Sequence, residues 1–224
     1  DGTVYHYGRE DHINKITPDG TASQIALPAG TVWLSALNST PDGHILMNIA
    51  VDNGDDTYSN TLARINQAGE IETYYSHVQV GGEDAIVGYS MTMDEDGNTW
   101  VGTYPDVEHA DILPLLTKIS PSGVVTRYDN PDGKIAINLM AAPNGEIWYK
   151  TFDGLFAKLN PSTGVTKSYK LLTPASEELL GSDAAGFNAN IGYYTPNAIM
   201  DSTGNIWISD SFVNRILKIS ANNT

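Results

Sequence analysis

The chain has 224 residues, of which 41% are hydrophobic and 17% charged, and this composition is that of a globular protein rather than a disordered or fibrous one. Its 27 acidic and 12 basic residues give a formal net charge of −15, which repels phosphate backbones and anionic lipid surfaces. Cysteine is absent, which excludes disulfides, thiolate metal sites and cysteine nucleophiles.

The same composition sets expectations about partners and location. The negative charge predicts no nucleic-acid partner, and no apolar run approaches the roughly 20 residues of a membrane span, so we expect no membrane insertion. An acidic chain that is poor in lysine and rich in Asn, Thr and Gly is typical of extracytoplasmic proteins, because such a surface stays soluble there. We therefore expect a secreted or periplasmic protein.

In chain order, the first repeated element is a tight glycine turn followed by an alternating strand. Asp-Gly and Asn-Gly form tight turns because glycine adopts positive φ without steric cost. The element recurs at 1–5, 42–46, 96–100, 144–148 and 203–207. Its last position holds Tyr5, Leu46, Trp100, Trp148 and Trp207. A large apolar side chain at one place in every unit is what the packing of one unit against the next requires.

A second repeated element follows each glycine turn and carries one basic residue. It occupies 13–16, 62–65, 116–119, 156–159 and 216–219. The basic residues are Lys15, Arg64, Lys118, Lys158 and Lys218. Such a row could form a ring of charge for an anionic ligand, or each cation could occupy an outward strand position where it is solvated or paired locally. We favour the outward strand position with a solvated or locally paired cation.

Two further strands complete each unit. An inner strand precedes the glycine turn at 34–40, 89–94, 136–142 and 197–201, and a fourth strand follows turns such as 121–123 and 161–164. Small side chains dominate the inner strand, where radial sheets crowd together. The anchors Gly2, Gly43, Gly97, Gly145 and Gly204 are 41, 54, 48 and 59 residues apart, close to the roughly 40–50 of propeller repeats.

The sequence therefore predicts an all-β fold: a single β-propeller domain, 1–224, of four-stranded antiparallel blades. Its five units are approximately 1–33, 34–88, 89–135, 136–195 and 196–224. The first unit begins at its second strand and the last ends after its third, which gives 18 strands with both termini inside a blade. Three interpretations stay open: closure with an incomplete blade, part of a larger propeller, or pairing of open edges with a partner chain or another copy.

The residues 204–208, Gly-Asn-Ile-Trp-Ile, followed by Asn214-Arg215-Ile216 and Lys218-Ile219, resemble the repeat of the virginiamycin B lyase (streptogramin lyase) family. The repeat also resembles NHL-type repeats. The resemblance implies a seven-bladed propeller that opens a cyclic depsipeptide ester by elimination, with a magnesium ion and with histidine and glutamate near one mouth of the channel. This chain departs from that pattern in its number of repeats and in its five scattered histidines, so no catalytic residue is carried over from the family.

Three long insertions indicate where a site could lie. They cover 50–60, 104–114 and 172–195. Each connects the second strand of a blade to the third, or the fourth strand to the next blade. Connections of these two kinds emerge on the same face of a propeller. The first contains Asp52, Asp55 and Asp56, and carboxylates so close together are ligands for magnesium or calcium. A solvated acidic turn is the alternative for this loop.

The second and third insertions hold the other candidate residues. Asp106, Glu108, His109 and Asp111 form the one carboxylate–histidine cluster, which could bind a divalent cation or relay a proton, or simply be an exposed loop. His12 also lies at such a connection, so the catalytic candidates are His109, Glu108 and His12, and Asp106 and Asp111 join the metal candidates. Tyr193, Tyr194 and Asn197, with Tyr89 at an inner strand, could bind a ring or sugar, or pack a long loop.

Two functions follow from these observations. The first is an extracytoplasmic propeller that binds or acts on a small cyclic or carbohydrate-like ligand, by metal-assisted lyase or hydrolase chemistry if it is an enzyme. The second is a non-catalytic module that binds a protein or glycan within a larger assembly. The sequence contains no Gly-x-Ser-x-Gly elbow, phosphate loop or dinucleotide fingerprint, which argues against those enzyme classes.

Overall fold

All regular structure in the described part of the chain is β-strand. The structure is a computed structural model that describes residues 2–8, 11–54, 58–66, 68–79, 88–103, 115–129, 136–151, 156–169, 198–210 and 215–221. These ranges contain eighteen strands. They contain no helix with the length and apolar character needed to cross a membrane.

The strands form five antiparallel sheets, which we call blades 1 to 5 in chain order. Blade 1 contains β1 (Val4–Tyr7), β2 (His12–Ile16) and β3 (Ala22–Ala26). Blade 2 contains β4 (Thr31–Ser39), β5 (Ile45–Asp52), β6 (Tyr58–Ile65) and β7 (Ile71–Gln79). Blade 3 contains β8 (Gly88–Met93), β9 (Thr99–Thr103), β10 (Leu115–Ile119) and β11 (Val125–Asp129). Blade 4 contains β12 (Ala136–Ala141), β13 (Ile147–Thr151), β14 (Phe156–Asn160) and β15 (Val165–Tyr169). Blade 5 contains β16 (Ala198–Met200), β17 (Ile206–Asp210) and β18 (Arg215–Ile219).

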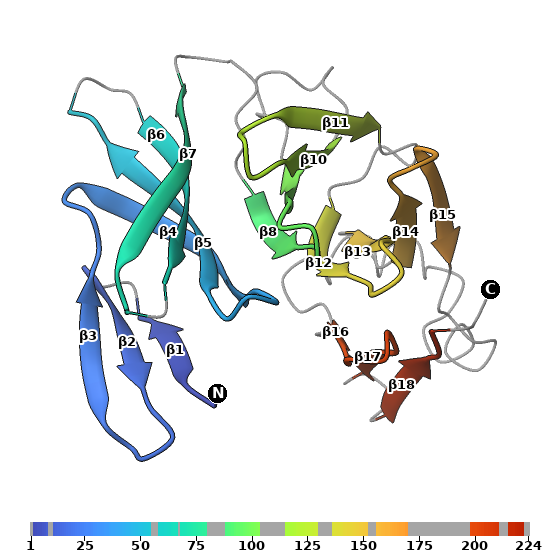
Figure 1. The fold of residues 1–224 in the computed structure, drawn as a ribbon, viewed down its shortest axis with the longest axis horizontal. Coiled ribbons are helices and arrows are strands. Elements are labelled where there is room, and N and C mark those ends of the chain that lie inside the picture. The colour runs from blue at the N-terminus through green and yellow to red at the C-terminus, as the bar shows by residue number, and fades with distance from the viewer. Residues whose placement is uncertain are drawn as a thin grey trace, which may run out of the picture.

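The blades stand around a common centre, in an arc that opens between blade 1 and blade 5 (Figure 1). Blades 2, 3 and 4 have four strands and blades 1 and 5 have three. The prediction of an all-β propeller with four-stranded antiparallel units is confirmed, as is the count of eighteen strands. β4 starts at Thr31, three residues before the inner strand expected at 34, because the β-branched pair Thr31-Val32 extends it.

The glycine turns connect the first two strands of each complete blade. In blade 3, Gly97 has φ of 78° and its N–H donates to the carbonyl of Asp94 at 3.0 Å. Asp94 holds the turn from its side chain as well: it accepts from the Asn98 backbone N–H at 2.9 Å and from the Trp100 indole Nε1 at 2.8 Å. Asp201 repeats this arrangement with Trp207 in blade 5. The turn therefore fixes the orientation of the aromatic residue that follows it.

Blades 1 to 4 each bury one face against the following blade, and the repeated large side chain lies in that interface. Trp100 and Leu116 of blade 3 pack with Ile147 and Tyr149 of blade 4. In the same way, Trp148 of blade 4 packs against the strands of blade 5. Burial of this apolar area is the main term that holds neighbouring blades together. The interpretation of the aromatic position as a packing position is confirmed.

The inner strands connect the blades around the centre. β4, β8, β12 and β16 contact one another in succession. Side chains link them: Asn38 donates to the Met91 carbonyl, the Leu139 N–H donates to Ser90 Oγ at 2.7 Å, and Asn138 donates to the Ala198 carbonyl at 2.7 Å. The pairing of β4 with β5 and of β12 with β13 is bulged beside these asparagines. The bulges turn the amides out of their own blade and toward the next one.

The row of basic residues is paired locally. Lys15 lies over Tyr5 at 6.0 Å, Lys118 over Trp100 at 5.8 Å, Lys158 over Trp148 at 5.3 Å and Lys218 over Trp207 at 5.1 Å, measured from Nζ to the ring centre. In each case the two residues are direct cross-strand partners. Arg64 has Leu46 opposite it and instead pairs with Glu72 at 2.9 Å. Of the two favoured states of these cations, solvated or locally paired, the contacts support the second.

Candidate ligand site

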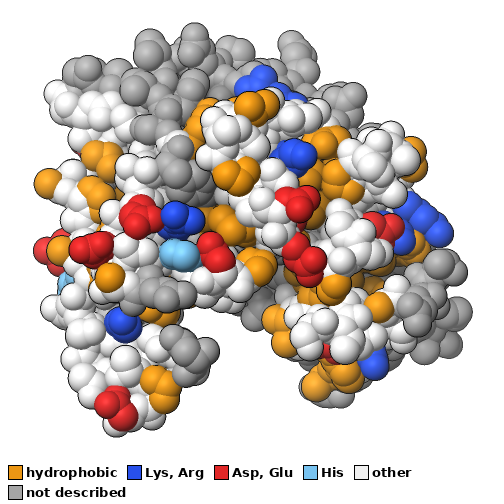
Figure 2. Space-filling model, in the orientation of Figure 1, with side chains coloured by type: hydrophobic (Ala, Val, Ile, Leu, Met, Phe, Trp, Pro, Cys, Tyr) orange, Lys and Arg blue, Asp and Glu red, His pale blue; other side chains and the backbone are white. Residues whose placement is uncertain are grey.

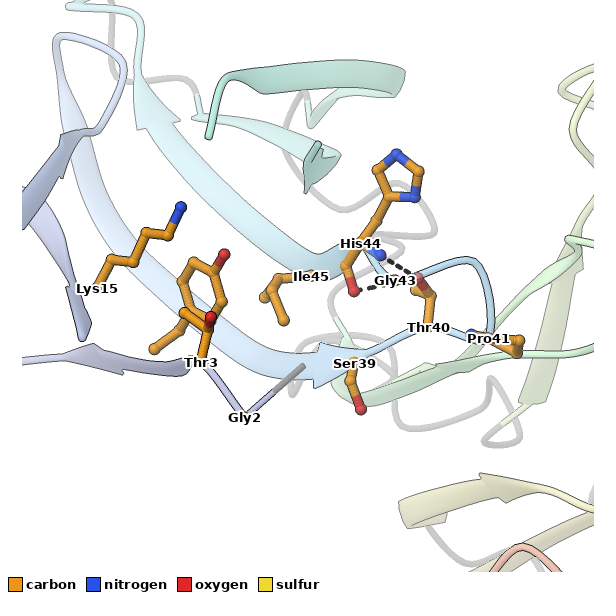
Figure 3. Close-up of a pocket in the computed structure, with 10 residues that line it drawn as sticks. Gly2, Thr3, Lys15, Ser39, Thr40, Pro41, Gly43, His44 and Ile45 are labelled. Carbon is orange, nitrogen blue, oxygen red and sulfur yellow. Dashed lines mark hydrogen bonds between the residues drawn. The ribbon is translucent and has the colours of Figure 1, made fainter. Parts of the chain in front are cut away.

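A pocket of about 710 Å³ opens where the glycine turn of blade 2 meets blade 1 (Figure 3). Gly2, Thr3, Tyr5 and Lys15 of blade 1 line one side. The other side consists of Ser39, Thr40, Pro41, Gly43, His44 and Ile45 of blade 2. The pocket therefore combines an aromatic ring, an ammonium group, hydroxyls and an imidazole.

The open space coincides with a departure from the repeat. The last position of the glycine-turn element is tryptophan in blades 3, 4 and 5, but in blade 1 it is the smaller Tyr5. Blade 2 has His44 where blades 3 and 5 have Asn98 and Asn205, whose amides fold back onto the turn aspartate. His44 also contacts its own turn, because its ring Nδ1 lies 2.9 Å from Asp42 Oδ1.

The cationic wall of the pocket is Lys15. Its ammonium lies 6.0 Å from the Tyr5 ring centre, and no ion pair joins it to a carboxylate among the residues that the structure describes. Lys158, at the equivalent place in blade 4, is paired with Glu146 at 2.9 Å. Lys15 therefore keeps its charge available to a ligand in a way that Lys158 does not.

The opposite wall is a network of side chains around Asp42. Its carboxylate accepts a hydrogen bond from the Thr40 hydroxyl and lies 2.9 Å from His44 Nδ1 and 3.8 Å from Arg64 Nη1. Partial burial alone would raise the pKa of Asp42, but Thr40 and His44 outweigh it and hold that pKa below its ordinary value. Asp42 is thus ionised at neutral pH, and it fixes the position of His44.

Two of the predicted site residues have described side chains, and both are engaged locally. His12 begins β2, with Nδ1 2.9 Å from Asp11 Oδ1 and Nε2 2.8 Å from Gln24 Nε2. Asp52 ends β5, where its carboxylate accepts from the Gly54 N–H at 2.8 Å. Both lie at the connections from second to third strand, where the sequence predicted them, and neither lines the pocket. The pocket is at the other end of the strands.

The other predicted site residues cannot be placed in the site. His109, Glu108, Asp106, Asp111, Asp55, Asp56, Tyr193, Tyr194 and Asn197 lie outside the described residues. Tyr89 belongs to β8, but its side chain is not among those described. Within the described ranges, no three His, Asp or Glu side chains come together as a metal site would require. The assignment of a divalent cation to the carboxylates at 52, 55, 56, 106 and 111 therefore stays a prediction.

The pocket residues were not singled out as a site by the sequence. The usable signal was the variation within the repeat, with Tyr5 in place of tryptophan and His44 in place of asparagine. Such variation shows that a blade interface differs from its neighbours. It does not show that two turns 40 residues apart meet around one space.

Comparison with known proteins identifies the fold. No protein-family model matches the chain. No curated protein matches it either. Among solved structures, selenomethionine-substituted virginiamycin B lyase from Staphylococcus aureus is 16% identical with a TM-score of 0.57, over 100% of this chain and 79% of the lyase. A streptogramin B lyase is 15% identical with a TM-score of 0.57, over 100% and 78%.

The chain has the propeller fold of these lyases. A protein of unknown function from Bacteroides caccae shares the fold too, at 16% identity and a TM-score of 0.58 over 94% of this chain and 72% of that one. The resemblance seen in the repeat is therefore confirmed at the level of the fold. Since one fold hosts many activities, the site has to carry the functional argument.

Proposed function

We propose that this chain is an extracytoplasmic propeller that binds a small cyclic or carbohydrate-like ligand in the pocket between blades 1 and 2. The observation that carries the proposal is the pocket itself. Its 710 Å³ falls within the roughly 300–1,000 Å³ of small-molecule sites. Its lining also offers the few convergent polar groups that orient a ligand in such sites.

The chemistry of the lining suits a polar ring. The Tyr5 ring offers a flat apolar surface against which a sugar or a peptide ring stacks. Ser39 and Thr3 supply hydroxyls that donate and accept, and Lys15 supplies an ammonium that donates only. These groups suit a ligand whose ring face stacks on Tyr5 and whose hydroxyls or carbonyls meet the pocket hydroxyls. The same ligand would present an acceptor or a negative charge to Lys15. The acidic composition supports an extracytoplasmic location.

Binding is tested by calorimetric titration of quinupristin, which a catalytically inactive Staphylococcus aureus lyase carries in its structure, and of a series of neutral and acidic oligosaccharides. We expect one member to bind and Lys15→Gln to weaken it about tenfold, the loss of one charged hydrogen bond. Lys118→Gln is the matched control, because Lys118 lies over Trp100 in the same way but outside the pocket. Equal effects of the two substitutions, or no binding by any member, would remove this proposal.

A second candidate function is ring opening of a cyclic depsipeptide, and the fold shared with two lyases favours it. In this proposal His109, Glu108 and His12 are the catalytic candidates, and the carboxylates at 52, 55, 56, 106 and 111 are the candidates for holding magnesium or calcium. Because the described residues form no metal cluster, we derive no catalytic step from them.

The lyase candidate has a simple assay. Quinupristin is incubated with the chain and magnesium, and the products are separated and weighed. Elimination gives a new species of unchanged mass, whereas hydrolysis adds the mass of one water. We expect His109→Ala to abolish either reaction and His6→Ala, on β1, to leave it unchanged. Unaltered quinupristin after long incubation of the unsubstituted chain would sink the candidate, while leaving ligand binding to be judged by calorimetry.

A further inference from the structure

The lining of the pocket between blades 1 and 2 differs in charge from the rest of the molecule. Lys15 and His44 are among the ten residues that line it, and none of the ten is Asp or Glu. The whole chain, in contrast, has 27 acidic residues against 12 basic ones and a formal net charge of −15. The pocket is therefore a locally positive place on a negative molecule.

The carboxylates of blade 2 beside this lining are engaged by groups of their own sheet. Asp42 lies in the same turn as the lining residues, yet its carboxylate accepts from the Thr40 hydroxyl and lies 2.9 Å from His44 Nδ1. On the neighbouring strands, Arg64 Nε donates to Glu72 at 2.9 Å. Figure 2 shows acidic side chains gathered with basic and histidine side chains left of centre, above the lobe that blade 1 forms. The negative charge of blade 2 is thus compensated within blade 2, and none of it reaches Lys15.

The ammonium of Lys15 spans the gap from blade 1 to blade 2. Its Nζ lies 6.0 Å from the Tyr5 ring centre, and a Cβ on Gly69, in the turn between β6 and β7, would lie 3.9 Å from it. Figure 3 shows the side chain extending from blade 1 toward the strand that carries Ile45. Because Gly69 has no side chain, this turn offers no carboxylate where the ammonium meets it. An ammonium in this position keeps its donors for a ligand.

We propose that the pocket selects a sugar ring that carries one anionic group, the class to which uronates and singly sulfated hexoses belong. This inference rests on the proposed ligand site and names the class of ligand that the site prefers. The ring packs against Tyr5, and its anionic group accepts a charge-assisted hydrogen bond from Lys15. A polyanionic chain suits the site less, because its further charges meet a molecule of net charge −15. Lys15 is thus the residue that determines specificity.

The test compares sugars that differ in one group. Calorimetric titration is carried out with the neutral hexose, the uronate and the 6-sulfate, in both the gluco and the galacto series, at one fixed salt concentration. We expect an acidic member to bind about tenfold more tightly than the neutral sugar of the same series, the gain from one charge-assisted hydrogen bond at a partly exposed site. The tighter of the two acidic forms identifies the group as carboxylate or sulfate.

Substitutions at Lys15 assign the preference to its charge. Lys15→Met should weaken the acidic sugar about tenfold more than the neutral one and so abolish the preference, whereas Lys15→Arg should keep it. Lys118→Met is the matched control, because Lys118 lies over Trp100 in the same way but outside the pocket. A preference that survives Lys15→Met, or that Lys118→Met abolishes equally, would overturn the inference.

A carboxylate added to the lining gives an independent check. Ser39 is an exposed lining residue, so Ser39→Asp should abolish the preference for the acidic sugar by repelling it. Ser122→Asp adds the same charge in an exposed turn of blade 3 outside the pocket and should leave the preference unchanged.

The failures of this inference and of the proposed function are distinguishable. Equal binding of neutral and acidic sugars, or binding of quinupristin alone, would overturn the anionic preference and leave the ligand site standing. Absence of binding by every sugar and by quinupristin would remove both.

Discussion

Lys150 in β13 is a lysine with a buried side chain. The residue is 1% exposed, and within the described part of the chain its Nζ has no hydrogen-bond partner. Burial therefore penalises the charged form and lowers the pKa of Lys150 from 10.5 to about 8. Below pH 8 the side chain is protonated in both the folded and the unfolded chain, so the folded state bears the full penalty there.

Lys150→Met should raise the free energy of unfolding at pH 7. Each pKa unit corresponds to about 1.4 kcal/mol, so the shift to about 8 implies a gain on the order of 3 kcal/mol. The advantage should shrink as the pH rises from 8 toward 10.5, because the buried lysine loses its proton in the folded chain and no longer bears the burial penalty of the charged form. Urea unfolding of the unsubstituted chain and of Lys150→Met at pH 7 and pH 10 measures the gain at each pH. A gain that is the same at both values would contradict the burial argument.

Asp94 shows how one turn residue controls a core side chain. Asp94→Ala removes the acceptor of the Trp100 indole, which is fully buried, and should lower the free energy of unfolding by about 1–3 kcal/mol. Asp96 in the same turn is exposed, so Asp96→Ala should change it by less than about 0.5 kcal/mol. Thermal or urea unfolding compares the two. Similar losses of unfolding free energy in the two variants would mean that the charge of the turn, and not the hydrogen bond to the indole, stabilises the fold.

At the scale of the element, the second and third strands of a blade are joined by a cation over an aromatic ring. Lys158 is the fullest example: it lies 5.3 Å from the Trp148 ring centre and donates to Glu146 at 3.0 Å. The Glu146 contact also raises the pKa of Lys158 above its ordinary value. The lysine thus ties the glycine turn to the third strand across the face of the tryptophan.

Removing these cations should weaken the blades in proportion to their contacts. Lys158→Met should lower the free energy of unfolding by about 1 kcal/mol, the sum expected for a partly buried ion pair and a ring contact. Lys118→Met, where the Trp100 ring is the cation's one partner among the described residues, should cost about 0.5 kcal/mol. Urea unfolding at low and high salt separates the ion-pair contribution from the ring contribution, since salt screens the Lys158–Glu146 ion pair. A larger loss at Lys118 would contradict this account.

At the scale of the whole molecule, the distance between blades depends on single positions. Gly102 in β9 faces the inner strand of blade 4, and a Cβ at this residue would lie 2.1 Å from the Ala136 carbonyl oxygen. That oxygen belongs to the backbone, so it cannot move without moving β12. The close approach of blades 3 and 4 therefore depends on the missing side chain at Gly102.

Gly102→Ala should push these blades apart and lower the free energy of unfolding by about 2–3 kcal/mol. Gly8→Ala is the control, because its Cβ would meet only the His6 ring, at an ordinary 3.6 Å, and should change stability by less than about 0.5 kcal/mol. Unfolding in urea gives both values. A neutral Gly102→Ala would show that β12 can shift freely relative to β9.

The sequence was informative about the blade and poorly informative about the site. The turns around Gly97 and Gly204, the inner strands and the packing role of Trp100 and Trp148 follow from signals within about ten residues, and all are present in the structure. His12 and Asp52 lie at the connections expected of them, yet each is bonded to its own neighbours. The pocket escaped prediction because its walls come from two blades.

The sequence by itself determined the repeating unit, the order of its strands and the likeness to the lyase fold, because turn chemistry and alternating burial act between near neighbours. Only the tertiary structure decided that Tyr5 and His44 border one pocket, that Lys150 is buried with no hydrogen-bond partner among the described residues, and that Ile216 is exposed where its four counterparts are covered. These properties depend on which blade stands beside which. Contacts between blades join residues tens of positions apart, and no local pattern encodes the space between them.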